Sequence, residues 1–198
     1  MSELYDVDET YPRACCYLQP SCKNLVFSLW ETPDVMSRKE TVIVTVLLIL
    51  FGTGMHFVHH FPFFNHFWGY IFPVQESVMA HMKMVLYPMS LLSLYLVISR
   101  RDIHEFGAPI LAGFTVMPLT VVVFFSYWVF VHHEILAIDV VIYVASIVGA
   151  VLLTQRWRKS GFVRKFWPIW MLVFILAAVL TGYLTYHGPD CIIFANLG

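Results

Sequence analysis

The sequence is poor in charged residues. Only 13% of its 198 residues are Asp, Glu, Lys or Arg, whereas 59% are hydrophobic and 17% are aromatic. A water-soluble domain usually carries about 25% charged residues and about 45–50% apolar ones. So large a deficit of charge excludes a surface that faces water on all sides, and it predicts an integral membrane protein.

Several functional motifs are also missing. The sequence contains no Gly-rich phosphate-binding loop, which argues against a nucleotide site. It has neither a basic stripe nor a finger-like Cys/His spacing, so we expect no nucleic-acid partner. Four cysteines in so apolar a chain do not make a disulfide framework. The first residues are polar and acidic, unlike a signal peptide, so we expect the first apolar run to stay in the protein.

Long apolar runs determine the expected fold. Crossing about 30 Å of hydrocarbon takes about 20 apolar residues in a helix. Helices are expected because lipid offers the backbone no hydrogen-bond partner. We therefore predict a cytosolic, partly disordered tail over residues 1–40 and an all-α transmembrane bundle over residues 41–198. The five expected spans are residues 41–61, 78–99, 107–131, 135–154 and 166–187.

The basic residues predict the orientation of the bundle. Eleven of the 12 precede the first span or lie between spans two and three or spans four and five. Because positive charge is retained on the cytosolic side, we predict a cytosolic N-terminus and a C-terminus outside. Lys83, within the second span, is the exception. The aromatic segment 62–77 is too short to span and is predicted to be interfacial or re-entrant.

Ionisable and polar side chains gather near the outer ends of these spans. An ionisable group inside a membrane is expensive and normally faces the bundle interior or a water-filled cavity. Four of the five spans would each bring at least one such group to a common depth. We therefore expect an outward-opening polar pocket. Its predicted residues are His56, Glu76, Ser77, His81, Lys83, Asp139 and His187.

The combination of imidazole and carboxylate groups suggests metal chemistry. Three protein ligands and a water on zinc make a hydrolytic site. We expect His56, His81 and His187 to be the zinc ligands, converging from different spans because the sequence has no H-E-x-x-H motif. The leading hypothesis is a metal-dependent hydrolase of a lipid or other amphiphile. Its predicted catalytic residues are Glu76, Ser77, Lys83 and Asp139, with Glu76 or Asp139 as the base.

Two other hypotheses account for the same residues. In a transporter, channel component or assembly factor they would bind protons or ions in transit. In a purely structural role, His56, His81 and Asp139 would form a hydrogen-bonded network that fixes helix packing. Lys83 would then pair with Glu76 or Asp139, or extend its ammonium toward the membrane surface.

The second span begins with a motif that resembles a known family. Val74-Gln75-Glu76-Ser77-Val78-Met79-Ala80-His81-Met82-Lys83 is similar to the pattern V-N-E-S-V-W-E-H-x-K of small multi-pass membrane proteins classed as a domain of unknown function. Asp139 and the stretch 183–194 fit further parts of that pattern. The resemblance implies this topology but brings no activity. The sequence departs from the pattern at Gln75, Met79, Ala80, Ala195 and Asn196, which removes a carboxylate beside His81.

Overall fold

The computed structural model describes residues 36–57, 66–72, 78–131 and 135–187 of the chain. Over these ranges the secondary structure consists of six α-helices and two short 3-10 helices, without a strand. Five of the α-helices are long and apolar enough to cross a membrane. The predicted all-α class and the five membrane-length helices are thus confirmed. These helices are α2 (Arg38–Phe57), α3 (Val78–Arg100), α4 (Gly107–Val131), α5 (Leu136–Trp157) and α7 (Trp167–His187).

The start of α2 has a clear local cause. The Ser37 side chain accepts a hydrogen bond from the Glu40 backbone N–H at 3.1 Å, and the Glu40 carboxylate accepts one from the Ser37 N–H at 3.3 Å. This reciprocal pair is a capping box, which satisfies two backbone donors at a helix N-terminus. It explains why α2 begins at Arg38, three residues before the predicted first span.

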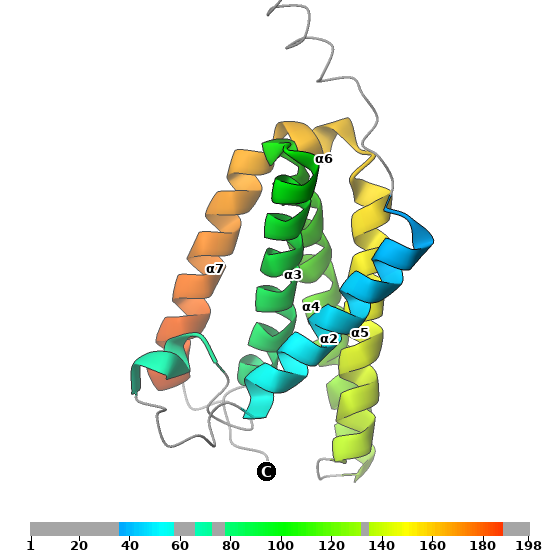
Figure 1. Cartoon of the computed structure of the whole chain (residues 1–198). Coiled ribbons are helices and arrows are strands. Elements are labelled where there is room, and N and C mark those ends of the chain that lie inside the picture. The colour runs from blue at the N-terminus through cyan, green and yellow to red at the C-terminus, as the bar shows by residue number, and fades with distance from the viewer. Residues whose placement is uncertain (1–35, 58–65, 73–77, 132–134, 188–198) are drawn as a thin grey trace, which may run out of the picture. The chain divides into compact units, whose positions relative to one another are not determined.

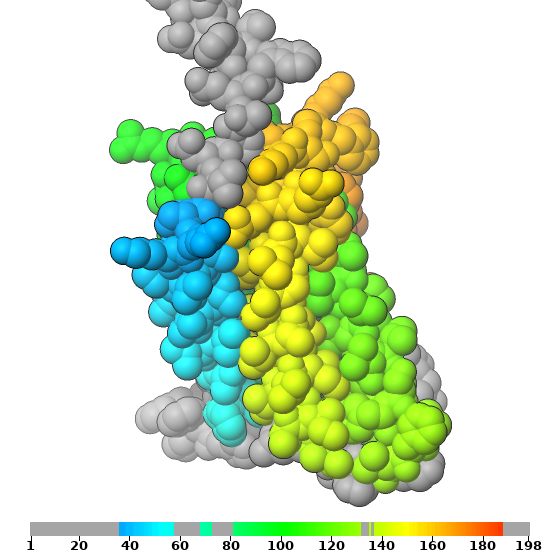
Figure 2. All heavy atoms as spheres, turned by 90° about the vertical axis from the view of Figure 1, so that its right-hand side faces the viewer, coloured from blue at the N-terminus to red at the C-terminus, as the bar shows by residue number. Residues whose placement is uncertain are grey.

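Helix α3 occupies the middle of the described bundle (Figure 1). It packs against α2, α4 and α7, and half of its membrane-length window is buried. Helices α4 and α5 form an antiparallel pair, and α2 lies beside α5 on one face (Figure 2). Helix α7 packs on α3 and α4 with only 11% of its window buried, so most of its surface faces outward. The most deeply buried apolar side chains include Met89, Leu92, Leu96, Ala112, Ile147 and Ala150.

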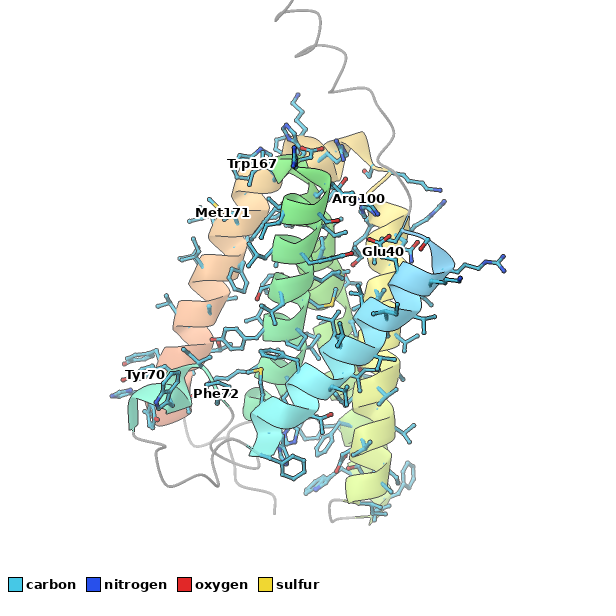
Figure 3. All side chains as sticks on the ribbon, viewed as in Figure 1. Glu40, Tyr70, Phe72, Arg100, Trp167 and Met171 are labelled. Carbon is cyan, nitrogen blue, oxygen red and sulfur yellow. The ribbon has the colours of Figure 1, made fainter. Side chains whose placement is uncertain are left out.

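Short helices close both ends of this bundle. Helix η3 (Ile103–Phe106) and helix α6 (Gly161–Lys165) lie at the end where α3 and α5 finish, and helix η2 (His66–Tyr70) lies at the other end (Figure 1). The η2 helix falls within the segment predicted to be interfacial, of which residues 62–65 and 73–77 lie outside the described ranges. Tyr70 and Phe72 lie beside the last turns of α7 (Figure 3), with the Tyr70 ring 5.1 Å from that of Tyr186.

Candidate functional site

A pocket lies between α3, α4 and α5. The pocket is open, and the empty space within it and in its mouth together is about 560 Å³. Its polar side chains are those of His81, Thr120, Asp139 and Tyr143, and the rest of its wall is apolar. A largely apolar cavity with a few convergent polar groups is the usual form of a small-molecule site. Its apolar wall is made by Met82, Met84, Val85, Met117, Val121, Phe124 and Ile142.

Two histidines meet beside this pocket. His81 stands on the first turns of α3 and His56 on the last turn of α2, and their ring centroids are 5.6 Å apart with the planes inclined by 36°. Both rings are half-buried. Two imidazoles at this separation, on two different helices, could donate to one metal ion or share a proton. The structure therefore brings together two of the three predicted zinc ligands.

Asp139 lines the same pocket from α5. The hydroxyl of Tyr127, on α4, donates a hydrogen bond to its Oδ1 atom. Asp139 is half-buried one turn into α5, where its backbone N–H donates to the Ile135 carbonyl at 3.1 Å. A carboxylate held on one oxygen by a phenol has a fixed direction, which is what a general base requires.

Tyr143 connects the pocket to α2. It stands one turn after Asp139 on α5 and lines the pocket. Its hydroxyl reaches across to α2 and donates to the carbonyls of Leu48 and Ile49, at 3.2 and 3.3 Å. The aromatic ring approaches α2 at Gly52, where a β-carbon would lie 2.0 Å from the Tyr143 hydroxyl. Tyr143 therefore both lines the pocket and holds α5 against α2.

Lys83 points away from the pocket. Its side chain is fully buried, and its ammonium donates to the Gly69 carbonyl at 2.7 Å and to the Thr185 hydroxyl at 2.6 Å. The Thr185 hydroxyl in turn donates to the Thr181 carbonyl at 2.8 Å. Lys83 thus ties η2 to α3 and α7. Of the two carboxylates suggested as its partner, Asp139 bonds to Tyr127 instead, and Glu76 lies outside the described ranges.

The third predicted zinc ligand is not joined to the other two. His187 is exposed at the end of α7, and its ring stacks on that of Tyr183 at 4.6 Å and 7°. Among the residues that the structure describes, no three His, Cys, Asp or Glu side chains are grouped as a metal site requires. Glu76 and Ser77 lie outside these residues. Zinc binding therefore stays a prediction.

An ionic network at the opposite end of the bundle was not anticipated from the sequence. The carboxylate of Glu105 in η3 binds Arg158 at 2.5 Å and Arg164 at 2.7 Å, and Arg164 also binds Asp102 at 2.7 Å. Glu105 and Arg158 are almost fully buried, with 1% and 2% of their side chains exposed. One feature of the sequence does suggest an internal ion pair here: the carboxylate lies between a pair of arginines and an apolar run.

The Asp139–Tyr127 bond was also missed, although a signal for it exists. A short connection between two spans makes them antiparallel neighbours. Residues equally far from the connection then face each other. The bonded pairs Tyr127–Asp139 and Thr120–Ser146 are both symmetric about position 133. Applying that symmetry to Asp139 would have pointed to Tyr127.

Comparison with known proteins gives a family match. Residues 31–197 match a family described as "Family of unknown function (DUF6512)", a range that takes in all the described helices. Neither the curated proteins nor the solved structures contain a significant match to the chain. The motif beginning at Val74 is not tested by this match. The chain belongs to this family of unknown function.

Proposed function

We propose that this protein is a membrane-embedded hydrolase of a lipid or related amphiphile. One observation carries the proposal: His81 and Asp139 line one pocket whose remaining wall is mostly apolar. A mostly apolar pocket with a few convergent polar side chains is the usual starting hypothesis for an active site. An apolar wall would hold the chain of an amphiphile and leave its polar group beside the two ionisable side chains. The five membrane-length helices would present such a substrate from the lipid phase.

The chemistry follows from the two ionisable groups. In the proposed step, Asp139 or His81 accepts a proton from a water molecule as that water adds to the carbonyl carbon of an acyl bond. The bond to the leaving group then breaks, and the leaving group takes up the proton. Tyr127 is a positioning residue, because its hydrogen bond orients Asp139. Tyr143 contributes to the wall of the pocket.

Zinc is an extension of this proposal. His56 and His81 would supply two nitrogen ligands, and a bound water would become the nucleophile. We also propose that the N-terminus is cytosolic, because the basic residues concentrate at the end of the bundle away from His81. The pocket would then open toward the outer side. Cysteine accessibility labelling of Lys159→Cys in intact cells tests this orientation, in a variant whose four native cysteines are replaced by Ser. Labelling by a membrane-impermeant reagent would contradict it.

The hydrolase proposal is tested with fluorogenic acyl esters of several chain lengths presented in detergent micelles. Asp139→Asn and His81→Gln are each expected to lower kcat/KM by at least about 100-fold, the lower bound for loss of acid–base catalysis. The matched control is His104→Gln at the other end of the bundle, where the ring contacts the Arg164 carbonyl. Wild-type rates in both pocket variants, or no hydrolysis of any amphiphile by the wild type, would contradict the proposal.

The zinc extension has a separate readout. Elemental analysis of the purified protein is expected to find near-stoichiometric zinc in the wild type and its loss in His81→Gln. His187→Gln distinguishes two coordination schemes. The variant keeps the metal if the site is built around His56 and His81, and loses it if the predicted triad forms. A well-folded wild type without metal would leave acid–base catalysis by His81 and Asp139 as the mechanism and discard zinc.

One observation favours a second candidate, a proton-coupled transporter. Lys83 is fully buried in a membrane-length helix, and its described hydrogen-bond partners are neutral oxygens. A cation placed in this way is expensive and typically functional. Under this candidate, Lys83→Met abolishes proton-coupled uptake in reconstituted vesicles while Thr185→Val retains part of it. Unchanged uptake with a lowered melting temperature in Lys83→Met would instead assign Lys83 a structural role.

A further inference from the structure

Among the described residues, the end of the bundle that carries η3 and α6 has an excess of positive charge. Three described carboxylates lie there, and each is bound by an arginine: Glu40 by Arg100, Glu105 by Arg158 and Arg164, and Asp102 by Arg164. Figure 3 shows Glu40 and Arg100 side by side near the start of α2. Every acidic side chain that the structure describes at this end is therefore paired with an arginine.

Six further cations at the same end are exposed, and none forms an ion pair with a described carboxylate. They project from the first turn of α2, the end of α3, the end of α5 and the α6 region, and so are distributed around the bundle (Figure 1). We call these residues the basic rim. They are Arg38, Lys39, Arg101, Arg156, Lys159 and Lys165.

The backbone at Arg101 gives a second, independent observation. Arg101 has a φ of 51°, in the left-handed region, just after the last residue of α3. The next N–H, that of Asp102, donates back to the Val97 carbonyl at 3.2 Å. This is the helix-ending geometry in which glycine is strongly preferred, because a β-carbon is strained there. A cation is thus held at a position where the fold alone favours glycine, and such strain points to function.

Aromatic side chains accompany the basic rim at the same level. Phe162 on α6 is 63% exposed, and the Lys165 ammonium lies 5.8 Å from the ring centre of Phe166. Trp167 opens α7 with its ring edge-on to His104. Cations mixed with aromatic rings at the ends of apolar helices are typical of the lipid headgroup level.

We infer that the basic rim binds phospholipids with negatively charged headgroups. Its cations are distributed around the ends of the helices instead of converging on one cavity, which fits a ring of lipids better than a single soluble anion. Their charge, which no described carboxylate compensates, attracts anionic headgroups and has no preference for zwitterionic ones. The attraction weakens with salt because the side chains are exposed.

The test measures which lipid contacts the rim of the full-length protein. Trp30, Trp68 and Trp128 are replaced by Phe, which leaves the three tryptophans of this end, Trp157, Trp167 and Trp170, as reporters. The protein is reconstituted with brominated phosphatidylglycerol or brominated phosphatidylcholine, whose bromine atoms quench tryptophan fluorescence. The relative association constant is expected to favour the anionic lipid by at least about tenfold at low salt, and the preference should shrink as sodium chloride is added.

Two variants make the inference falsifiable. Replacing all six rim residues with Gln should abolish the preference. Arg101→Gly should lower it about fivefold, the effect of one charge, while raising the melting temperature because the left-handed strain is relieved. Equal quenching by both lipids in the wild type, or a preference unchanged in Arg101→Gly, would overturn the inference. A preference that is lost when inorganic phosphate is added, but kept when chloride is added to the same ionic strength, would also overturn the inference. That result would indicate a site for a free anion.

Discussion

Replacing Glu105 with glutamine is expected to lower the free energy of unfolding by about 3–5 kcal/mol, the range for breaking a buried ion pair from one side. Glu105 is 1% exposed and accepts hydrogen bonds from both Arg158 and Arg164. The glutamine amide has the same size but no charge, and it directs hydrogens toward arginine donors. Arg164 would keep Asp102 as a partner. Arg158, which is 2% exposed, would remain a buried cation without a compensating charge.

Thermal unfolding in detergent, followed by circular dichroism, measures this effect. The matched control is Glu40→Gln, which removes the carboxylate from a partly exposed pair with Arg100 and should cost no more than about 1 kcal/mol. The double variant Glu105→Gln, Arg158→Met should recover most of the loss, because removing both buried charges is often neutral or stabilising. Equal melting temperatures for Glu105→Gln and Glu40→Gln would contradict the buried network.

The membrane-length helices were predictable because the bilayer leaves little choice. The predicted span 107–131 coincides with α4, and the predicted span 78–99 differs from α3 by one residue. About 20 consecutive apolar residues must form a helix in lipid, so composition alone is decisive there. The run 155–165 was expected to be a connection because it is rich in charge. Instead α5 continues to Trp157 and α6 follows, with Arg158 and Arg164 paired internally to Glu105.

The sequence predicts how deep each residue of the candidate site lies along its helix. It does not predict which side of the helix that residue occupies. His81 and Asp139 do line one pocket, as residues at a common depth should when they face inward. Lys83 shares their depth, yet residues two apart on a helix point to different sides. Its ammonium accordingly reaches η2 and α7, away from the pocket. The position of His187 beside Tyr183 depends on how α7 is rotated, which a run of apolar residues does not determine.

Gly52→Ala is expected to destabilise the fold by about 1–3 kcal/mol, whereas Gly54→Ala in the same helix should be neutral or slightly stabilising. A β-carbon at Gly52 would lie 2.0 Å from the Tyr143 hydroxyl and 3.1 Å from the Met84 carbonyl, so both α5 and α3 obstruct it. Overpacking of this kind costs about 1–3 kcal/mol. At Gly54 no atom lies within 4 Å of the added carbon. There the change should only remove the helix penalty of glycine, about 0.5–1 kcal/mol.

The comparison of these two alanine variants isolates packing from helix propensity, because both positions lie inside α2. Melting temperatures in detergent give the stability difference. Tyr143→Phe combined with Gly52→Ala should recover part of the loss, since the hydroxyl is the atom that the new carbon meets first. If Gly52→Ala were as stable as Gly54→Ala, α2 could not lie against Tyr143 as described. Because Tyr143 also lines the pocket, displacing it in Gly52→Ala should weaken amphiphile binding, while Gly54→Ala should leave that binding unchanged.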